Sequence, residues 1–480
     1  MTYRRFSYNE FFGELQCYSK QVTGSMFKFW YNQKLYLIDC GLVQGDGNDK
    51  ENFEIKLSKD ELDKVEAIII THGHIDHCGM LMKYVAAGYN GPIYTTNTTK
   101  KIFKYNLPDT VKVQNEYAQD TEYRHFANIS DVMQTIDQVV TLDYYERNEI
   151  SEDVFLTLIP NSHIPGAAMV LIEIAVPDNI KCETLENSIN LLFTGDLGFH
   201  NPFIDNKEVP ERIKKLPLTI ICESTYGASD SKDVEAKFRE DIVDLFGKKR
   251  ILIPVCALNK AQEILYHLGK IQRAYPLPKI YYDGPLSHSY TREYPEYEEI
   301  REDMKDFLPE NVNFVTKENR CKVLNTVNPI IVTTSGMGTN GPAKTYIEKT
   351  VSDKDTVIYF TSYCAENTLG RKLLESEGVV EIGGIERKLE AEVISTGEFS
   401  SHAKRDEICE FLKQFKNIKT IYLNHGDNGV KESFKEYLEE NGLNNIYIIS
   451  GKNYRLGPYG MIKELKVNAR RWDSNRIFLR

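Results

Sequence analysis

Two rhythms of apolar and polar positions divide the 480-residue chain near Leu216. Before this point, short apolar runs separated by turn residues are typical of β-strands. These runs lie at 25–39, 67–70, 154–159, 169–175 and 191–194. Asn32-Gln33 divides the first run and predicts a hairpin. The polar segment 98–149 has a mostly helical pattern, so we interpret it as an insertion on a mainly β layer.

After Leu216, apolar strands alternate with helical patterns, which is the signature of a parallel α/β sheet. The strands are predicted at 218–222, 251–255, 279–282, 330–334 and 357–361, with helices at 259–268 and 369–375. We therefore expect a second domain. After Gly383-Gly384 the pattern returns to strands at 391–394 and 420–423, with helices at 404–415 and 430–440.

The segment Thr71–His77 reads Thr-His-Gly-His-Ile-Asp-His and concentrates ligand-type side chains on one loop. The strand-like run Ala67–Ile70 precedes it, and the helical pattern Cys78–Ala87 follows and ends at Gly88. Imidazole and carboxylate together suit zinc or a similar divalent ion. The alternative is a polar loop with chance histidines. The chain has only 10 histidines, so the grouping of three on this loop favours a metal site.

Three later residues follow strand-like runs and have glycine nearby, namely His163, Asp196 and His425. An aspartate can bridge two cations, and a histidine from a separate strand can complete each coordination shell. The predicted ligands are therefore His72, His74 and His163 for one metal, Asp76, His77 and His425 for the other, and Asp196 between them.

The interval between Asp196 and His425 is far longer than a single βα unit needs. A whole domain is therefore expected between two ligands of one metal site, which places the active site in a cleft between domains. Such a cleft suits a long polymer better than a small ester.

The composition agrees with an enzyme of the cell interior. The 9 cysteines are scattered and lack a C-x-x-C pair, which indicates reduced thiols. The chain shows neither a signal-peptide pattern nor an apolar run of about 20 residues, so we expect no membrane association and a cytoplasmic location. The net charge of -11 weighs mildly against nucleic-acid binding, but bound divalent cations would supply positive charge locally.

The ordered set Asp39, His72-x-His74-x-Asp76-His77, His163 and Asp196 resembles the metallo-β-lactamase superfamily. The rest of the chain resembles its β-CASP branch. That group processes nucleic acids and includes the endonuclease subunit of the cleavage and polyadenylation specificity factor and ribonuclease J. Three further motifs carry this resemblance, at Glu223, His402 and His425. The stretches Ile253–Glu263 and Thr334–Gly338 favour the cleavage-factor-like subgroup.

This resemblance covers roughly residues 20 to 455 and implies an α/β fold. It implies a metallo-β-lactamase αββα sandwich at 1–209 and 389–465 and an inserted Rossmann-like β-CASP domain at 210–388. The residues themselves indicate a basic tail at 466–480, which we interpret as solvated, with a nucleic-acid contact as the alternative. The chain departs from the family pattern at Gln21, where an acidic residue is usual, and at Asn259-Lys260, where a Gly-Arg pair is usual. Gly338 stands where a larger apolar residue is common.

The family's chemistry suggests a role for each motif residue. His402 is the candidate general acid, and Glu223 orients its ring and favours its protonated form. Asp76 counts among the catalytic as well as the metal-binding residues, and Asp39 is expected to orient a ligand histidine, although a carboxylate that satisfies a turn is an equal alternative. Ser335, Gly336 and Met337 are candidate phosphate contacts, with a plain tight turn as the alternative.

We therefore expect a ribonuclease that holds two Zn²⁺ ions, with Mn²⁺ as the alternative metal. It would hydrolyse RNA internally and leave a 5′-phosphate and a 3′-hydroxyl. The alternatives are a hydrolase of small esters, lactones or thioesters, a nuclease of the same branch that acts on single-stranded DNA, and a non-catalytic scaffold. Homodimerisation through other surfaces stays open.

Overall fold

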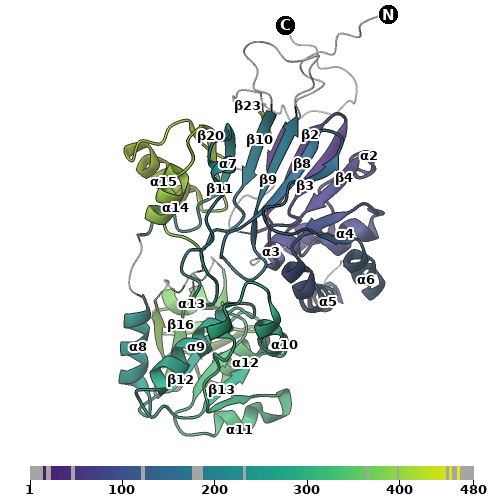
Figure 1. Cartoon of the computed structure of the whole chain (residues 1–480). Coiled ribbons are helices and arrows are strands. Elements are labelled where there is room, and N and C mark those ends of the chain that lie inside the picture. Colours follow the sequence, from purple (N-terminus) through teal and green to yellow (C-terminus); the bar gives the residue numbers. More distant parts are fainter. Residues whose placement is uncertain are drawn as a thin grey trace, which may run out of the picture.

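Two sheets that face each other form the upper lobe of the computed structural model, and a third sheet forms the lower lobe (Figure 1). The structure describes residues 14–17, 23–44, 49–119, 125–175, 188–230, 234–362, 364, 367–396, 399, 401–449, 453–456 and 462–464. Gln21 and the predicted tail at 466–480 lie outside the described residues. Among the residues it describes, none of the helices combines the length and apolar character needed to cross a bilayer.

The first sheet has eight strands in the order β23-β22-β1-β2-β3-β4-β5-β6. Its strands are β1 (Glu14–Cys17), β2 (Phe27–Tyr31), β3 (Lys34–Ile38), β4 (Val65–Ile69), β5 (Ile93–Thr95), β6 (Val139–Thr141), β22 (Asn453–Leu456) and β23 (Ile462–Glu464). The predicted hairpin is confirmed, because β2 and β3 pair in antiparallel register around Asn32 and Gln33. Both turn residues have positive φ, 47° and 64°, as a tight two-residue hairpin turn requires.

The second sheet has seven strands in the order β21-β20-β11-β10-β9-β8-β7. Its strands are β7 (Asn148–Ser151), β8 (Val154–Pro160), β9 (Ala168–Ala175), β10 (Ser188–Phe193), β11 (Leu218–Glu223), β20 (Ile418–Asn424) and β21 (Ile446–Ile448). Apolar side chains of the two sheets share one core, in which Tyr36 and Ile69 of the first sheet pack with Leu158 and Ile172 of the second. Burial of these facing surfaces holds the two sheets together.

Helices cover the outer face of each sheet. The first sheet is covered by α4 (Leu81–Ala86), α5 (Asn97–Gln119) and α6 (Ile129–Asp137), and the second by α7 (Glu211–Lys214), α14 (Arg405–Lys413) and α15 (Asn428–Glu440). Phe103 and Leu107 of α5 belong to the core beneath the first sheet. The result is an αββα sandwich, as expected. The segment predicted as an insertion at 98–149 thus supplies outer helices and also two edge strands, β6 and β7.

The third sheet has six strands in the order β14-β13-β15-β12-β16-β19, and all its pairs are parallel. Its strands are β12 (Arg250–Pro254), β13 (Ile280–Asp283), β14 (Val312–Phe314), β15 (Ile330–Thr333), β16 (Thr356–Phe360) and β19 (Glu392–Ser395). One face packs on α8 (Val234–Leu245), α9 (Lys260–Gln272) and α10 (Pro285–Glu293), and the other on α11 (Arg320–Leu324), α12 (Gly341–Thr350) and α13 (Leu369–Glu375). Burial on both faces explains why these strands are apolar throughout.

We call residues 234–395 the inserted unit. A hairpin of β17 (Val379–Ile382) and β18 (Ile385–Lys388) leads into β19, which is an edge strand of the third sheet because it pairs with β16. We therefore place the return of the chain to the sandwich after Ser395, a few residues later than the predicted boundary at 389.

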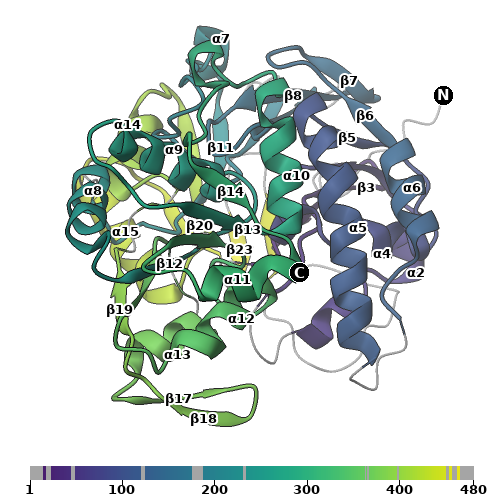
Figure 2. The same cartoon turned by 90° about the horizontal axis from the view of Figure 1, so that it is seen from below.

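The sandwich and the inserted unit meet along α5 and α10, which lie side by side (Figures 1 and 2). The hydroxyl of Tyr105 donates to Glu293 at 2.9 Å, and the hydroxyl of Tyr144 donates to Glu299 at 2.8 Å. These contacts fix the inserted unit relative to the sandwich.

Candidate metal centre

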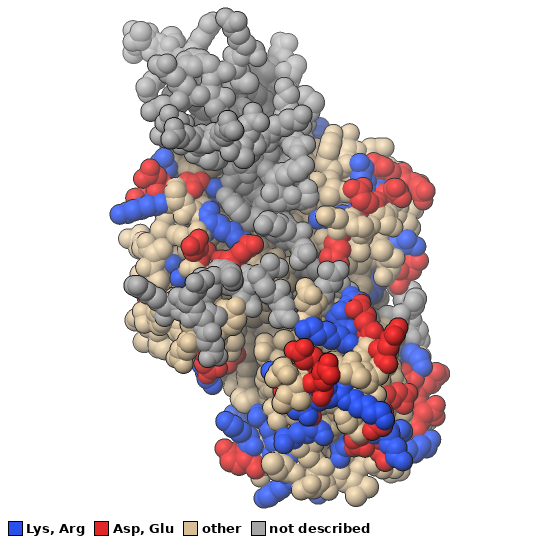
Figure 3. Space-filling view, turned by 180° about the vertical axis from the view of Figure 1, so that it is seen from behind, with Lys and Arg blue, Asp and Glu red and all other residues tan. Residues whose placement is uncertain are grey.

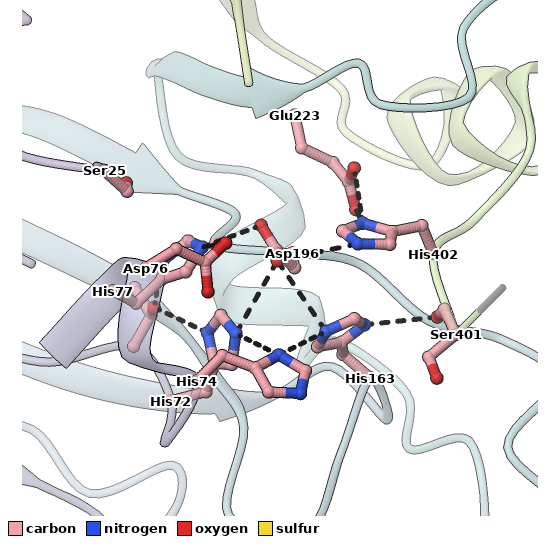
Figure 4. Close-up of polar contacts among 12 residues, drawn as sticks. Ser25, His72, His74, Asp76, His77, His163, Asp196, Glu223, Ser401 and His402 are labelled. Carbon is pink, nitrogen blue, oxygen red and sulfur yellow. Dashed lines mark hydrogen bonds and ion pairs between the residues drawn. The ribbon is translucent and has the colours of Figure 1, made fainter. Parts of the chain in front are cut away.

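The predicted metal ligands come from separate strand ends and converge on one point (Figure 4). His72 and His74 follow β4, and His74 is the residue before α3 (Ile75–Cys78), which carries Asp76 and His77. The other ligands follow β8, β10 and β20. Because these strands end at the same edge of the sandwich, residues far apart in sequence become neighbours. The structure thus brings together all the predicted ligands, in groups whose donor atoms lie within 4.8 Å of one another.

The first group consists of His72, His74, His163 and Asp196. Nδ1 of His74 lies 3.1 Å from Nε2 of His72 and 3.2 Å from Nε2 of His163. Oδ2 of Asp196 lies 3.6 Å from Nε2 of His72 and 3.7 Å from Nε2 of His163. Two nitrogens bound to one tetrahedral zinc ion at about 2.0–2.1 Å would lie about 3.4 Å apart, so the spacing fits such an ion.

The second group consists of Asp76, His77 and His425. Oδ2 of Asp76 lies 3.9 Å from Nε2 of His77 and 3.9 Å from Nε2 of His425. The other carboxylate oxygen of Asp196, Oδ1, lies 3.3 Å from Nε2 of His77 and 3.4 Å from Nδ1 of His425. Asp196 therefore offers one oxygen to each group, as a bridging carboxylate would.

Unsatisfied polar atoms test whether a cation fits. Within the described part of the chain, Nε2 of His77, Nε2 of His425 and Oδ1 of Asp196 are buried and have no hydrogen-bond partner. Such orphaned atoms are costly in a folded protein, and a bound cation would satisfy them together. This donor set of imidazoles and carboxylates suits zinc or a similar divalent ion.

The electrostatics of the first group agree with cation binding. Burial lowers the pKa values of His72 and His163 well below the ordinary value for histidine, and it lowers the pKa of His74 to about 4. These rings are therefore neutral, which is the form that binds a metal. Burial alone would raise the pKa of Asp196, but His425 and His77 hold it well below its usual range, so this carboxylate is anionic.

Hydrogen bonds to Nδ1 orient the rings of two predicted ligands, His77 and His163. Asp39 is buried and accepts from Nδ1 of His77 at 2.7 Å and from the backbone N–H of Thr71 at 2.9 Å. Nδ1 of His163 contacts the carbonyl oxygen of Ser401 at 3.2 Å. With their Nδ1 atoms held in this way, His77 and His163 direct Nε2 toward the clusters. The contact expected between Asp39 and a ligand histidine is thus present.

Buried Glu223 and half-buried His402 form a pair next to the clusters (Figure 4). Nδ1 of His402 lies 2.9 Å from Oε2 of Glu223, and Glu223 also accepts from the backbone N–H of Leu197. Nε2 of His402 lies 3.8 Å from Oδ2 of Asp196. Burial alone would lower the pKa of His402, but the carboxylates of Glu223 and Asp196 raise it to about 8. A protonated imidazole facing the clusters can donate a proton there.

The predicted phosphate contacts lie in the turn between β15 and α12. The hydroxyl of Ser335 lies 3.4 Å from the backbone nitrogen of Asn340 within this turn. Gly336 packs on the end of β12, where an added Cβ would lie 3.0 Å from the backbone nitrogen of Cys256. The turn is therefore at the carboxyl edge of the third sheet, and phosphate binding by Ser335, Gly336 and Met337 stays a prediction.

Two supporting residues were not predicted from the sequence. Ser401 holds His163 through its carbonyl oxygen, and every residue has a carbonyl, so the sequence carries no signal for this role. The hydroxyl of Thr225 lies 3.0 Å from Nδ1 of His425. Thr225 lies in the same motif as Glu223, and this proximity was the available signal.

Buried histidine and aspartate clusters at the strand ends of an αββα sandwich define a metal-dependent hydrolase. Three family models match the chain in order: the metallo-beta-lactamase superfamily at residues 23–230, the Beta-Casp domain at 261–373, and the Zn-dependent metallo-hydrolase RNA specificity domain at 386–449. The chain belongs to the β-CASP branch of the metallo-β-lactamase superfamily.

Several known proteins are similar to this chain. Transcription termination factor FttA of Methanocaldococcus jannaschii is 29% identical over 422 residues, which cover 82% of this chain and 63% of the factor. A ribonuclease of Thermus thermophilus is 28% identical over 427 residues, which cover 85% of this chain and 91% of the ribonuclease. A probable RNase of Methanocaldococcus jannaschii is 28% identical over 450 residues, which cover 91% and 98%. The chain thus spans about 63% of the length of the FttA relative.

A solved structure shares the fold. The crystal structure of a protein of unknown function from Enterococcus faecalis superposes with a TM-score of 0.50 at 12% identity, covering 93% of this chain and 100% of that protein.

Proposed function

We propose that this protein is a zinc-dependent endoribonuclease that hydrolyses RNA phosphodiester bonds and leaves a 5′-phosphate and a 3′-hydroxyl. The observation that carries the proposal is the Glu223–His402 pair, which lies beside the carboxylate shared by both ligand groups. The names of two relatives, a ribonuclease and a probable RNase, support RNA as the substrate. The match to an RNA specificity domain supports it further.

Each ligand group would hold one cation. His72, His74 and His163 would hold the first, Asp76, His77 and His425 the second, and Asp196 both. Two divalent cations there would supply a nucleophilic water at neutral pH and compensate the charge on the phosphoryl oxygens.

His402 would protonate the leaving oxygen. Oε2 of Glu223 lies 2.9 Å from Nδ1 of His402, so the other ring nitrogen, Nε2, faces the clusters. The negative charge of Glu223 also favours the protonated form of the ring. When the P–O bond breaks, the proton on Nε2 would pass to the departing 3′-oxygen, which leaves as a hydroxyl. The downstream RNA fragment would keep the phosphate on its 5′ end.

The position of the inserted unit favours a polymer substrate. The unit interrupts the chain between Asp196 and His425, and Asn259, which follows its strand β12, donates to Ser401 next to His402. Positive and negative side chains are interspersed on the face of the lower lobe seen in Figure 3, so that face offers no single basic patch. We therefore expect the cations at the centre to supply the main attraction for phosphate.

A labelled-substrate experiment tests the proposal. Zinc-loaded protein is incubated with one sequence as 5′-labelled RNA, 3′-labelled RNA and single-stranded DNA, and the products are sized and their ends determined. Internal RNA fragments with 5′-phosphate and 3′-hydroxyl ends are expected, and none with Asp196→Ala. Cleavage of DNA alone would assign a different substrate. Turnover of an ester, lactone or thioester without RNA cleavage would indicate a small-molecule hydrolase. A purified chain that binds no zinc and turns nothing over would indicate a scaffold.

A further inference from the structure

Asn259 occupies a strained turn between β12 and α9, at the carboxyl edge of the inserted sheet. Its φ is 66° and its ψ is -51°, and the backbone N–H of Lys260 donates to the carbonyl of Leu258 at 2.8 Å. This is a classic γ-turn, a rare and strained conformation for a residue with a side chain. Glycine could adopt it without this strain. The asparagine side chain must therefore contribute something that glycine cannot.

The side chain of Asn259 is 1% exposed and connects three segments. Its Nδ2 donates to the hydroxyl of Ser401 at 3.0 Å. Its Oδ1 accepts from Nδ2 of Asn201 at 3.0 Å and from the hydroxyl of Tyr294 at 2.6 Å. Tyr294 belongs to the inserted unit, whereas Ser401 and Asn201 belong to the sandwich. One amide therefore links the two lobes.

Both sandwich partners lead directly to His163. The carbonyl oxygen of Ser401 contacts Nδ1 of His163 at 3.2 Å, and Nδ2 of Asn201 also donates to the backbone carbonyl of His163 at 3.2 Å. Ser401 is followed by His402 in the chain. The carbonyl of Ser401 has little room to shift, because a Cβ on Gly198 would lie only 2.6 Å from its oxygen. Through Ser401 and Asn201, the amide of Asn259 is thus connected to the ring and the backbone of His163, a predicted ligand. Ser401 also precedes His402, the predicted acid.

We propose that Asn259 is a positioning residue through which the inserted unit sets the orientation of His163 and His402. The catalytic part of this inference rests on the proposed function, and the metal-binding part stands on the ligand geometry alone. The family resemblance implies a glycine at this position, and a glycine has no side chain with which to make this link.

Two variants each remove the hydrogen bond between Asn259 and Ser401, one by changing the donor and the other by changing the acceptor. Asn259→Gly relieves the γ-turn strain and removes all the side-chain bonds. Ser401→Ala removes only the bond to Asn259 and keeps the carbonyl that holds His163. Contacts behind a ligand histidine typically change metal affinity or activity 10- to 100-fold when removed. For each variant we expect weaker Zn²⁺ binding by about tenfold or more, measured by competition with a chelator, and an altered visible spectrum of the Co²⁺-loaded protein.

The kinetic expectation distinguishes positioning from substrate binding. We expect kcat for RNA to fall about tenfold or more while KM changes little, since the residues affected act on His163 and His402 and not on the substrate. The double variant should lose no more than the larger single loss, because both substitutions break the same link. Asn328→Gly is the matched control, because Asn328 is also an asparagine of the inserted unit with positive φ (44°), and among the described residues its amide bonds only to the carbonyl of Gly247.

The proposal would be overturned by wild-type Zn²⁺ affinity, Co²⁺ spectrum and kcat in Asn259→Gly. It would also be overturned by losses that simply add in the double variant, or by equal losses in the Asn328→Gly control. If Asn259→Gly does not fold, Ser401→Ala with the same measurements decides the question. If the wild-type protein cleaves no RNA, the proposed function fails, while zinc affinity and the cobalt spectrum still test the role of Asn259.

Discussion

Glu223 and His402 lie 179 positions apart in the sequence, yet Oε2 of Glu223 is 2.9 Å from Nδ1 of His402. Glu223 is the last residue of β11, and His402 lies just before α14, so the pair forms only when the chain returns from the inserted unit to the sandwich. The backbone N–H of Leu197 fixes the carboxylate from the other side. The acid candidate is therefore held at Nδ1 by Glu223 and comes close to Asp196 only in the folded protein.

Replacing His402 separates proton donation from metal binding. We expect His402→Ala to lower kcat about 10²- to 10⁴-fold, the usual contribution of a general acid, while zinc content stays near that of the wild type. Single-turnover RNA cleavage and elemental analysis measure the two quantities. His125→Ala is the control, because His125 is exposed and contacts Asn128 away from the clusters. Loss of zinc in His402→Ala would show that His402 is a ligand.

The charge of Glu223 should set the alkaline limit of activity. Burial lowers the pKa of His402, whereas Glu223 and Asp196 raise it to about 8. Because the acid must be protonated, activity is lost as the pH rises through this pKa. In Glu223→Gln the raising charge is gone, so the alkaline limb of the profile of kcat against pH should move to lower pH. An unshifted limb would assign the limit to another group.

The order of elements was predictable because local patterns determine it. Helix α13 spans the predicted residues 369–375, and β8 at Val154–Pro160 extends the predicted strand by one residue. The partner of a strand is not local information. The run at 391–394 predicted a strand but not its membership of the third sheet, because pairing with β16 depends on how the whole inserted unit packs.

The convergence of the predicted ligands could be expected because histidine and aspartate at strand ends carry a clear chemical signal. Their binding of metal stays a prediction. The contacts that support them could not be expected, because they use groups without such a signal. Ser401 acts through its backbone carbonyl, and Asn259 acts from a different lobe through an amide common in turns. Only the folded arrangement of the whole chain reveals these links.

Asp39 should control the affinity of the second ligand group. It accepts hydrogen bonds from Nδ1 of His77 and from the backbone of Thr71, so an amide at this position would oppose donors with its own N–H groups. We expect Asp39→Asn to weaken binding of one zinc ion about 10- to 100-fold and to leave the other nearly unchanged. Zinc titration by calorimetry separates the two affinities. Asp303→Asn, at an exposed carboxylate paired with Arg301, is the control. Two unchanged affinities in Asp39→Asn would mean that Asp39 only stabilises its turn.

Zinc should stabilise the folded protein, because its binding would satisfy buried atoms of His77, His425 and Asp196 that otherwise lack partners among the described residues. One site at a free zinc concentration of a hundred times its Kd adds about 2.7 kcal/mol to the free energy of unfolding. We expect a clear rise in Tm with zinc for the wild type and a smaller rise for His163→Ala, which keeps the second group. Asp196→Ala, which removes the carboxylate shared by both groups, should lose most of the effect. Calorimetric melting with zinc and with a chelator measures these shifts. An equal rise in Asp196→Ala and the wild type would place the stabilising zinc outside these groups.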